Sequence, residues 1–391
     1  MATSAAVRAS RASELIERAK AETSLGDFGE DSFREGLEIL VRSADAEARF
    51  NDVGRMAFDA QVVSFLSFRL QIEDWYARHP EIDEQEIVAP LIGLGLPRTG
   101  STALSCLLAE DPEVRFIRNW EAMAPCPPPE AASRHTDPRI AAAEETMTRR
   151  DQLFPRMRAM LPSTATGPTE CQTFMGYDFK SQLFQAFARI PTYTEWLNHE
   201  ADLVPTYRYV KRVLKLLQWR CPPTRWRLKN PSHSMFIGAL DEVFPDARYW
   251  MTHRDIASVV PSVCDVYLEL SKAYSDDVDK RFLGQQNAAW TELGLQRVIA
   301  FRDKQGQNDR FFDIHFAPFQ QDPFPALEAL YGFLGEELTA ETRARMAAWR
   351  ISMPRETNVA RTDPSEFGID IAALRERFRF YSNRFDVAVA A

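Results

Sequence analysis

The chain has 391 residues, 45% of them hydrophobic, and a formal net charge of −9. This length and apolar content allow a large buried core, in one large domain or two modest ones. The acidic balance argues against a nucleic-acid or anionic-membrane partner, because either would need a cationic face. Any anion site must therefore be a local basic pocket on an acidic molecule.

The five cysteines are an odd number without a CxxC pair, which fits neither a disulfide framework nor a zinc site. Cysteines in this arrangement are typical of a reducing compartment. The charged N-terminal segment contains no apolar core of signal-peptide length, and no later run is long enough to span a membrane. We therefore expect a cytoplasmic enzyme without a membrane span.

Residues 1–85 are predicted to form a helical cap. Apolar residues recur at spacings of three and four over residues 33–44 and again over residues 56–70. Pro80 ends the second of these helices. We expect this cap to be followed by one compact α/β domain over residues 86–391.

A glycine loop follows the cap and is the most informative part of the sequence. An apolar run over residues 89–96 predicts a strand, which ends in the loop Gly-Leu-Pro-Arg-Thr-Gly-Ser-Thr of residues 95–102. Gly95 and Gly100 are spaced as in a P-loop, and the apolar pattern of residues 103–108 predicts a helix directly after the loop. The pattern indicates a phosphate-binding loop between a strand and a helix.

The loop departs from a P-loop in its charge. Ser101 follows Gly100 where a P-loop has lysine, and the cation of the loop is Arg98, two residues before that glycine. We therefore expect the loop to bind a phosphate, but not for hydrolysis of a nucleoside triphosphate.

The next hundred residues predict one short strand and a largely helical segment. Residues 114–117 have the pattern of a strand, and the prolines between residues 125 and 129 predict an irregular segment. Residues 139–220 have mainly helical periodicity, with many aromatic residues that could either pack in the core or line a pocket.

Two further strand-to-helix units and a last strand complete the pattern. Residues 226–228 and 247–252 predict strands that end in Lys229 and Arg254, and residues 310–316 predict the last strand. Strands that alternate with helices in this way predict a parallel sheet, with ligands bound at the carboxyl ends of its strands.

Three of the loops that follow these strands carry a cation, namely Arg98, Lys229 and Arg254. Loops at the carboxyl edge of a parallel sheet converge, so these side chains can hold one ligand with several anionic groups. Ser262 follows Arg254 by eight residues on the next predicted helix, and its hydroxyl could hold a phosphate together with that guanidinium.

Four segments in series resemble the PAPS-dependent sulfotransferase superfamily, in particular its bacterial members of the Sulfotransfer_3 type. They are the glycine loop of residues 95–102, Trp120-Glu121 before a proline-rich turn, the segment 225–233 that ends in Lys-Asn-Pro-Ser-His, and residues 244–262. The similarity extends over about residues 90 to 385.

The resemblance implies a P-loop-like sulfotransferase fold, with a central parallel sheet flanked by helices. It also implies that the co-substrate is 3′-phosphoadenosine 5′-phosphosulfate (PAPS), that the product is adenosine 3′,5′-bisphosphate (PAP), and that no metal is needed. Arg98 and the backbone of the loop would bind the 5′-phosphosulfate, Lys229 would follow the transferring group, and Arg254 with Ser262 would hold the 3′-phosphate. The loop residues assigned to the co-substrate are Pro97, Arg98, Thr99, Gly100, Ser101 and Thr102.

Transfer to a hydroxyl also needs a base. His233 is preferred, because it lies close to the position of a catalytic histidine in cytosolic members and an imidazole accepts a proton near neutral pH. Glu170 and Glu121 are the alternatives, since related carbohydrate-type enzymes often use a glutamate. His253 is expected to make a structural hydrogen bond beside Arg254.

The expected function is transfer of a sulfuryl group from PAPS to the hydroxyl or amine of a small, hydrophobic or aromatic acceptor. Two alternatives remain open at this point. One is a P-loop small-molecule kinase that uses ATP, and the other is a catalytically inactive nucleotide-binding protein.

Overall fold

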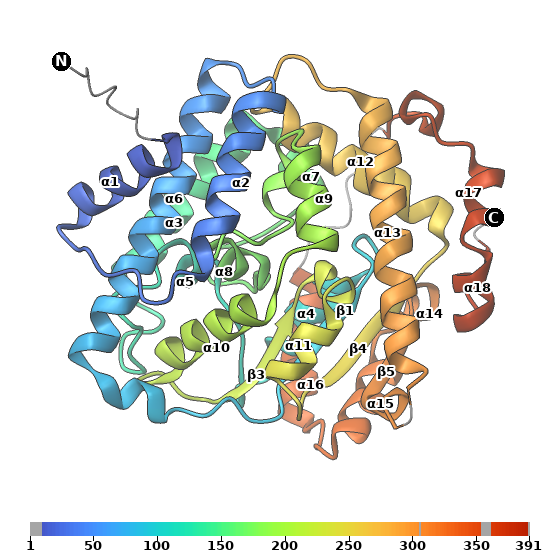
Figure 1. The fold of residues 1–391 in the computed structure, drawn as a ribbon. Coiled ribbons are helices and arrows are strands. Elements are labelled where there is room, and N and C mark those ends of the chain that lie inside the picture. Colours follow the sequence, from blue (N-terminus) through green and yellow to red (C-terminus); the bar gives the residue numbers. More distant parts are fainter. Residues whose placement is uncertain (1–9, 305, 353–360, 390–391) are drawn as a thin grey trace, which may run out of the picture.

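In the computed structural model, residues 10–304, 306–352 and 361–389 are described. A parallel five-stranded sheet lies at its centre, in the order β2-β3-β1-β4-β5 (Figure 1). The strands are β1 (Leu91–Gly95), β2 (Val114–Arg115), β3 (Arg225–Lys229), β4 (Arg248–His253) and β5 (Phe311–His315). The α/β class and the parallel sheet predicted from the sequence are therefore confirmed.

Helices cover both faces of the sheet, as the alternation of side chains along its strands requires. On one face, Leu91 and Trp250 pack in a cluster with α4 (Ser101–Leu108), α15 (Phe324–Leu334) and α16 (Ala340–Ser352). On the other face, Ile92 and Met251 belong to the large core shared with α11 (Ile237–Val243), α12 (Ile256–Lys272) and α13 (Lys280–Arg302). Figure 1 shows α13 running beside β4 and β5.

The N-terminal helices are α1 (Arg11–Thr23), α2 (Ser32–Glu47) and α3 (Asp52–Arg78), followed by the 3₁₀ turn η1 (Pro80–Glu84). They confirm the helical character predicted for this part of the chain, and α1 is a helix that the two apolar patterns did not include. Leu37 and Leu66 are fully buried in the same core cluster as Ile92 and Leu94 of β1. The division of the chain at residue 85 stays a prediction.

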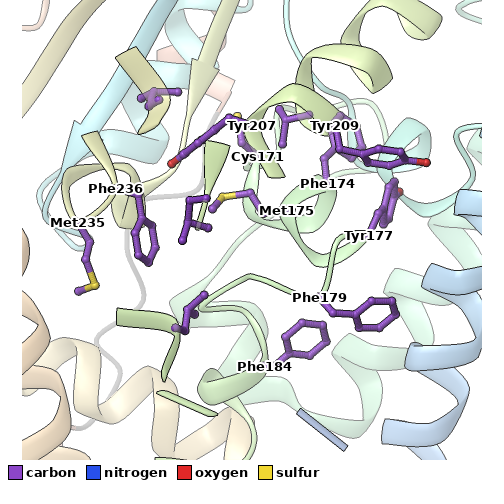
Figure 2. Close-up of a cluster of buried hydrophobic side chains, with 14 of the residues drawn as sticks. Cys171, Phe174, Met175, Tyr177, Phe179, Phe184, Tyr207, Tyr209, Met235 and Phe236 are labelled. Atoms are coloured by element: carbon purple, nitrogen blue, oxygen red, sulfur yellow. The ribbon is translucent and has the colours of Figure 1, made fainter. Parts of the chain in front are cut away.

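One long crossover joins β2 to β3, and it is largely helical as expected. Its helices are α5 (Asn119–Met123), α6 (Pro138–Leu153), α7 (Pro155–Met160), α8 (Gln172–Gly176), α9 (Pro191–His199) and α10 (Val204–Gln218), with the 3₁₀ turn η2 (Phe184–Ala186). Its aromatic residues Phe174, Tyr177 and Phe179 are fully buried in one cluster (Figure 2). These aromatics are therefore core residues.

The C-terminal part contains α14 (Phe316–Gln321), the 3₁₀ turn η5 (Pro364–Phe367), α17 (Ile371–Arg377) and α18 (Arg379–Phe385). Two further 3₁₀ turns are η3 (Pro231–Ser234), after β3, and η4 (Asn308–Arg310), before β5. None of the helices in the described part of the chain has the length and apolar character needed to cross a bilayer.

Gly93 gives the first prediction, because it permits the close approach of β1 and β4. A Cβ atom at this position would lie 2.1 Å from the Trp250 ring. We expect Gly93→Ala to lower the free energy of unfolding by at least about 1–3 kcal/mol, since the buried indole has no space to move into. Urea denaturation followed by circular dichroism measures this.

Gly238 on α11 is the matched control, since a Cβ atom there would meet nothing within 4 Å. Gly238→Ala should leave stability unchanged or raise it by up to about 1 kcal/mol, because alanine favours a helix. Equal stabilities of the two variants would contradict the packing argument.

Candidate active site

The glycine loop turns sharply between β1 and α4. Gly95, Arg98 and Gly100 have φ angles of 102°, 64° and 84°, in the left-handed region that glycine adopts most easily. Thr99 is fully buried, and its hydroxyl donates to the carbonyl oxygen of Leu96 at 2.6 Å. The same hydroxyl forms a hydrogen bond with the hydroxyl of Thr252, so the loop is tied to the carboxyl end of β4.

Arg98, Arg254 and Ser262, predicted from separate segments, lie together beside this loop. Arg98 Nε donates to Ser262 Oγ at 3.1 Å, and Arg254 Nη1 donates to the carbonyl oxygen of Arg98 at 2.9 Å. The Arg254 guanidinium stacks on the ring of Phe316, with its carbon 4.1 Å from the ring centroid. Two guanidinium groups and one hydroxyl are thus gathered at the carboxyl edge of the sheet.

Lys229 ends β3 and joins the glycine loop to the crossover. Its ammonium, which is buried, donates to Glu170 Oε1 at 2.8 Å and to Thr102 Oγ1 at 3.2 Å. Thr102 lies in the first turn of α4, whereas Glu170 lies in the segment before α8. Because an ammonium has three N–H donors, these two bonds leave one for a ligand.

His233 is buried in η3 behind Lys229. Its Nδ1 lies 2.8 Å from the hydroxyl oxygen of Tyr207 on α10, and no partner within the described residues reaches its Nε2. Burial lowers the pKa of His233 to about 3. Because burial penalises the charged form, it makes His233 a weaker base than the exposed imidazole on which its choice as the base rested.

Glu121 is held by a structural ion-pair network. Its carboxylate accepts hydrogen bonds from Arg115 at 2.6 and 3.1 Å and from the Arg118 side chain at 3.2 Å, and both Arg115 and Glu121 are fully buried. The carboxylate also accepts the backbone N–H of Arg118 and caps the start of α5. Both oxygens of the Glu121 carboxylate are therefore engaged by structural partners.

His253 makes structural hydrogen bonds, as expected. Its Nε2 lies 2.8 Å from Asp313 Oδ1 on β5, and Asp313 also accepts two hydrogen bonds from Arg302 at 2.8 and 2.7 Å. Burial alone would raise the pKa of Asp313, but the hydrogen bonds from Arg302 and His253 hold it well below its usual range. The hydroxyl of Tyr381 lies 3.3 Å from both His253 Nδ1 and the backbone nitrogen of Arg254.

Sequence reasoning did not find several of these supporting residues, namely Tyr207, Arg302, Asp313, Phe316 and Tyr381. Tyr381 lies in an aromatic run over residues 378–385, which gives no indication of its partners. The other contacts join residues far apart in the chain, so no local pattern indicates them. Within the described residues, no group of three or more His, Cys, Asp or Glu side chains could hold a metal ion.

A glycine loop at the carboxyl edge of a parallel sheet, with helices on both faces, defines a P-loop-like fold. A family model described as "Sulfotransferase family" matches residues 90–340 of this chain. The chain is therefore a member of the sulfotransferase family.

Solved structures agree with this membership. The sulfotransferase STF9 from Mycobacterium avium is 32% identical, with a TM-score of 0.89, and the match covers 98% of this chain and 99% of that one. The sulfotransferase STF1 from Mycobacterium tuberculosis H37Rv is 27% identical, with a TM-score of 0.84, and the match covers 94% and 97% of the two chains. The comparison with curated proteins gives no match.

Glu121 provides the second prediction. Glu121→Gln leaves the buried Arg115 without its carboxylate, so the free energy of unfolding should fall by about 3–5 kcal/mol in urea denaturation. Glu145→Gln is the control, because Glu145 pairs with Arg149 on the exposed face of α6. It should cost no more than about 0.5 kcal/mol. A stable Glu121→Gln variant without sulfotransfer activity would reverse the structural assignment.

Proposed function

We propose that this sulfotransferase uses PAPS as its sulfuryl donor and acts on a hydroxyl or amine of a small, hydrophobic or aromatic acceptor. The observation that carries the proposal is the convergence of Arg98, Arg254 and Ser262 beside the glycine loop. Such a cluster suits a ligand with two separate anionic groups, and PAPS has a 5′-phosphosulfate and a 3′-phosphate.

The residues proposed to bind PAPS fall into two groups, one for the 5′-phosphosulfate and one for the 3′-phosphate. Arg98 and the backbone N–H groups of residues 99–102 are assigned to the 5′-phosphosulfate, since successive N–H groups at the start of a helix bind an anion well. Arg254, after β4, and Ser262, on α12, both contact Arg98 and suit the 3′-phosphate. The absence of lysine after Gly100 disfavours the alternative of a kinase that uses ATP.

Lys229 is proposed to stabilise the transition state. In sulfuryl transfer the bond between sulfur and the phosphate oxygen breaks while a bond to the acceptor oxygen or nitrogen forms, and the leaving phosphate gains negative charge. The buried Lys229 ammonium is anchored by Thr102 on the donor side and Glu170 on the other side. A fixed cation in this position offsets the developing charge without reorganisation.

The acceptor proton requires a base, and the contacts favour Glu170 over His233. Glu170 is partly exposed and lies 2.8 Å from Lys229, whereas His233 is buried and its pKa is about 3. Partial exposure lets the Glu170 carboxylate reach an acceptor, whereas the His233 ring is enclosed by protein. His233 remains the second candidate through Nε2, which requires the proton to lie on Nδ1 and to be donated to Tyr207.

The third prediction concerns the 3′-phosphate. PAP should raise the melting temperature of the protein more than ADP does at equal concentration, because Arg254 and Ser262 recognise a group that ADP lacks. Arg254→Ala should weaken PAP binding about 10- to 100-fold, the value of a charge-assisted hydrogen bond. Differential scanning fluorimetry and calorimetric titration measure both effects.

Arg149→Ala, on the exposed face of α6, is the matched control and should keep the preference for PAP. Equal stabilisation by PAP and ADP would refute the assignment of the 3′-phosphate site. A PAP preference without sulfated product from a broad acceptor panel would instead support the inactive nucleotide-binding alternative.

The fourth prediction separates the two bases. Glu170→Gln should lower kcat about 10²- to 10⁴-fold, the usual contribution of a general base, and should leave the affinity for PAP unchanged. His233→Asn should reduce kcat much less. Mass detection of the sulfated acceptor, with PAP titration as the folding control, measures these effects. The opposite order of the two variants would assign the base to His233.

A further inference from the structure

The C-terminal helices α17 and α18 contact the turn that carries Arg254. Two residues, Arg254 and Asp255, join the end of β4 to the start of α12. Figure 1 shows α17 and α18 on the outer side of α13, to which Arg377 of α17 is joined by an ion pair with Glu292. The two helices reach the turn through side chains that lie 120 and 127 residues further along the chain.

Tyr381 on α18 makes the first of these contacts. Its side chain is fully buried, and its hydroxyl oxygen accepts the backbone N–H of Arg254 at 3.3 Å. The same oxygen lies 3.5 Å from the carbonyl oxygen of Arg254. The hydroxyl therefore holds the backbone of Arg254 just beyond the last residue of β4, from which the guanidinium reaches the glycine loop.

His253 sets the direction of the Tyr381 hydroxyl. His253 Nε2 lies 2.8 Å from Asp313 Oδ1, and because a carboxylate only accepts hydrogen bonds, Nε2 carries a proton. Burial lowers the pKa of His253, which keeps the ring neutral and leaves Nδ1 as an acceptor. Tyr381 thus donates its O–H to Nδ1 at 3.3 Å, and its oxygen accepts the N–H of Arg254.

Arg375 on α17 makes the second contact, with the other residue of the turn. Its Nη2 donates to Asp255 Oδ2 at 2.7 Å, and the Asp255 side chain is buried. Asp255 Oδ1 accepts the backbone N–H of Ala257 at 3.1 Å and caps the start of α12. Ser262 lies on this same helix. The second contact therefore ties the start of α12 to the C-terminal helices.

We propose that Tyr381 and Arg375 are positioning residues, which hold Arg254 in place for the 3′-phosphate. This inference rests on the proposed function, which assigns Arg254 to that group. An arginine side chain loses much conformational freedom when its guanidinium is fixed on a ligand, so a backbone that is already fixed lowers the cost of binding. The selectivity for a nucleotide with a 3′-phosphate then depends on α17 and α18 as well as on the residues that touch the ligand.

Calorimetric titration of the full chain with PAP and with ADP tests the proposal, since ADP lacks the 3′-phosphate. Tyr381→Phe should lower the affinity for PAP about 2- to 10-fold, the value of one hydrogen bond, and leave the affinity for ADP unchanged. Arg375→Gln changes a partly exposed side chain, should act in the same direction, and carries the test if Tyr381→Phe does not fold. Tyr193→Phe is the matched control and should keep both affinities, because the buried Tyr193 hydroxyl also accepts a backbone N–H, that of Ser181 in the crossover.

The Arg254→Ala background separates positioning from a direct contact with the ligand. A residue that acts through Arg254 has no further effect once the guanidinium is removed, so each variant combined with Arg254→Ala should bind PAP as Arg254→Ala alone does. An unchanged PAP affinity in either folded single variant, an equal loss of ADP affinity, or a further loss in the Arg254→Ala background would overturn the proposal while the parent chain still prefers PAP. A parent chain without that preference would refute the 3′-phosphate assignment itself, and this inference with it.

Discussion

The candidate site depends on the register of β1 between β3 and β4. Gly93 lies opposite Lys229 on β3 and opposite Trp250 on β4, and Gly95 lies opposite Thr252. This register brings the ends of three strands to the same level, so the loops that follow them face one another. The absence of a side chain at Gly93 makes the close approach possible, since the Trp250 ring fills the space where a Cβ atom would lie.

The charged side chains at the carboxyl edge of the sheet form two groups. Arg254 donates to the backbone of Arg98 beside the glycine loop, so two cationic residues lie at this end of the edge and favour an anion. Lys229 lies deeper, and its charge is matched by Glu170. An acidic protein can hold a polyanionic donor in this way, because the local positive charge is concentrated where the strands end.

The sequence predicts well which cations meet at the strand ends and predicts poorly the contacts made by the crossover, for a physical reason. Arg98, Lys229 and Arg254 each follow a strand directly, and parallel strands bring their carboxyl ends together whatever the details of packing. The low pKa of His233 depends instead on burial, and its partner Tyr207 lies 26 residues earlier on another helix, so no local pattern contains either property. The pairing of Glu170 with Lys229, and of Glu121 with Arg115, likewise depends on the path of a long crossover.

The crossover of residues 116–224 has a consequence for how such an enzyme diversifies. This single segment carries Glu170 and the buried aromatic cluster, whereas Arg98, Arg254 and Ser262 lie outside it. Substitutions in the crossover can therefore accumulate while the contact of Arg98 with the carbonyl oxygen of Met160 is kept, because that contact uses the backbone of the crossover. Natural selection, or a protein engineer, can therefore change the crossover while the cations at the strand ends stay the same.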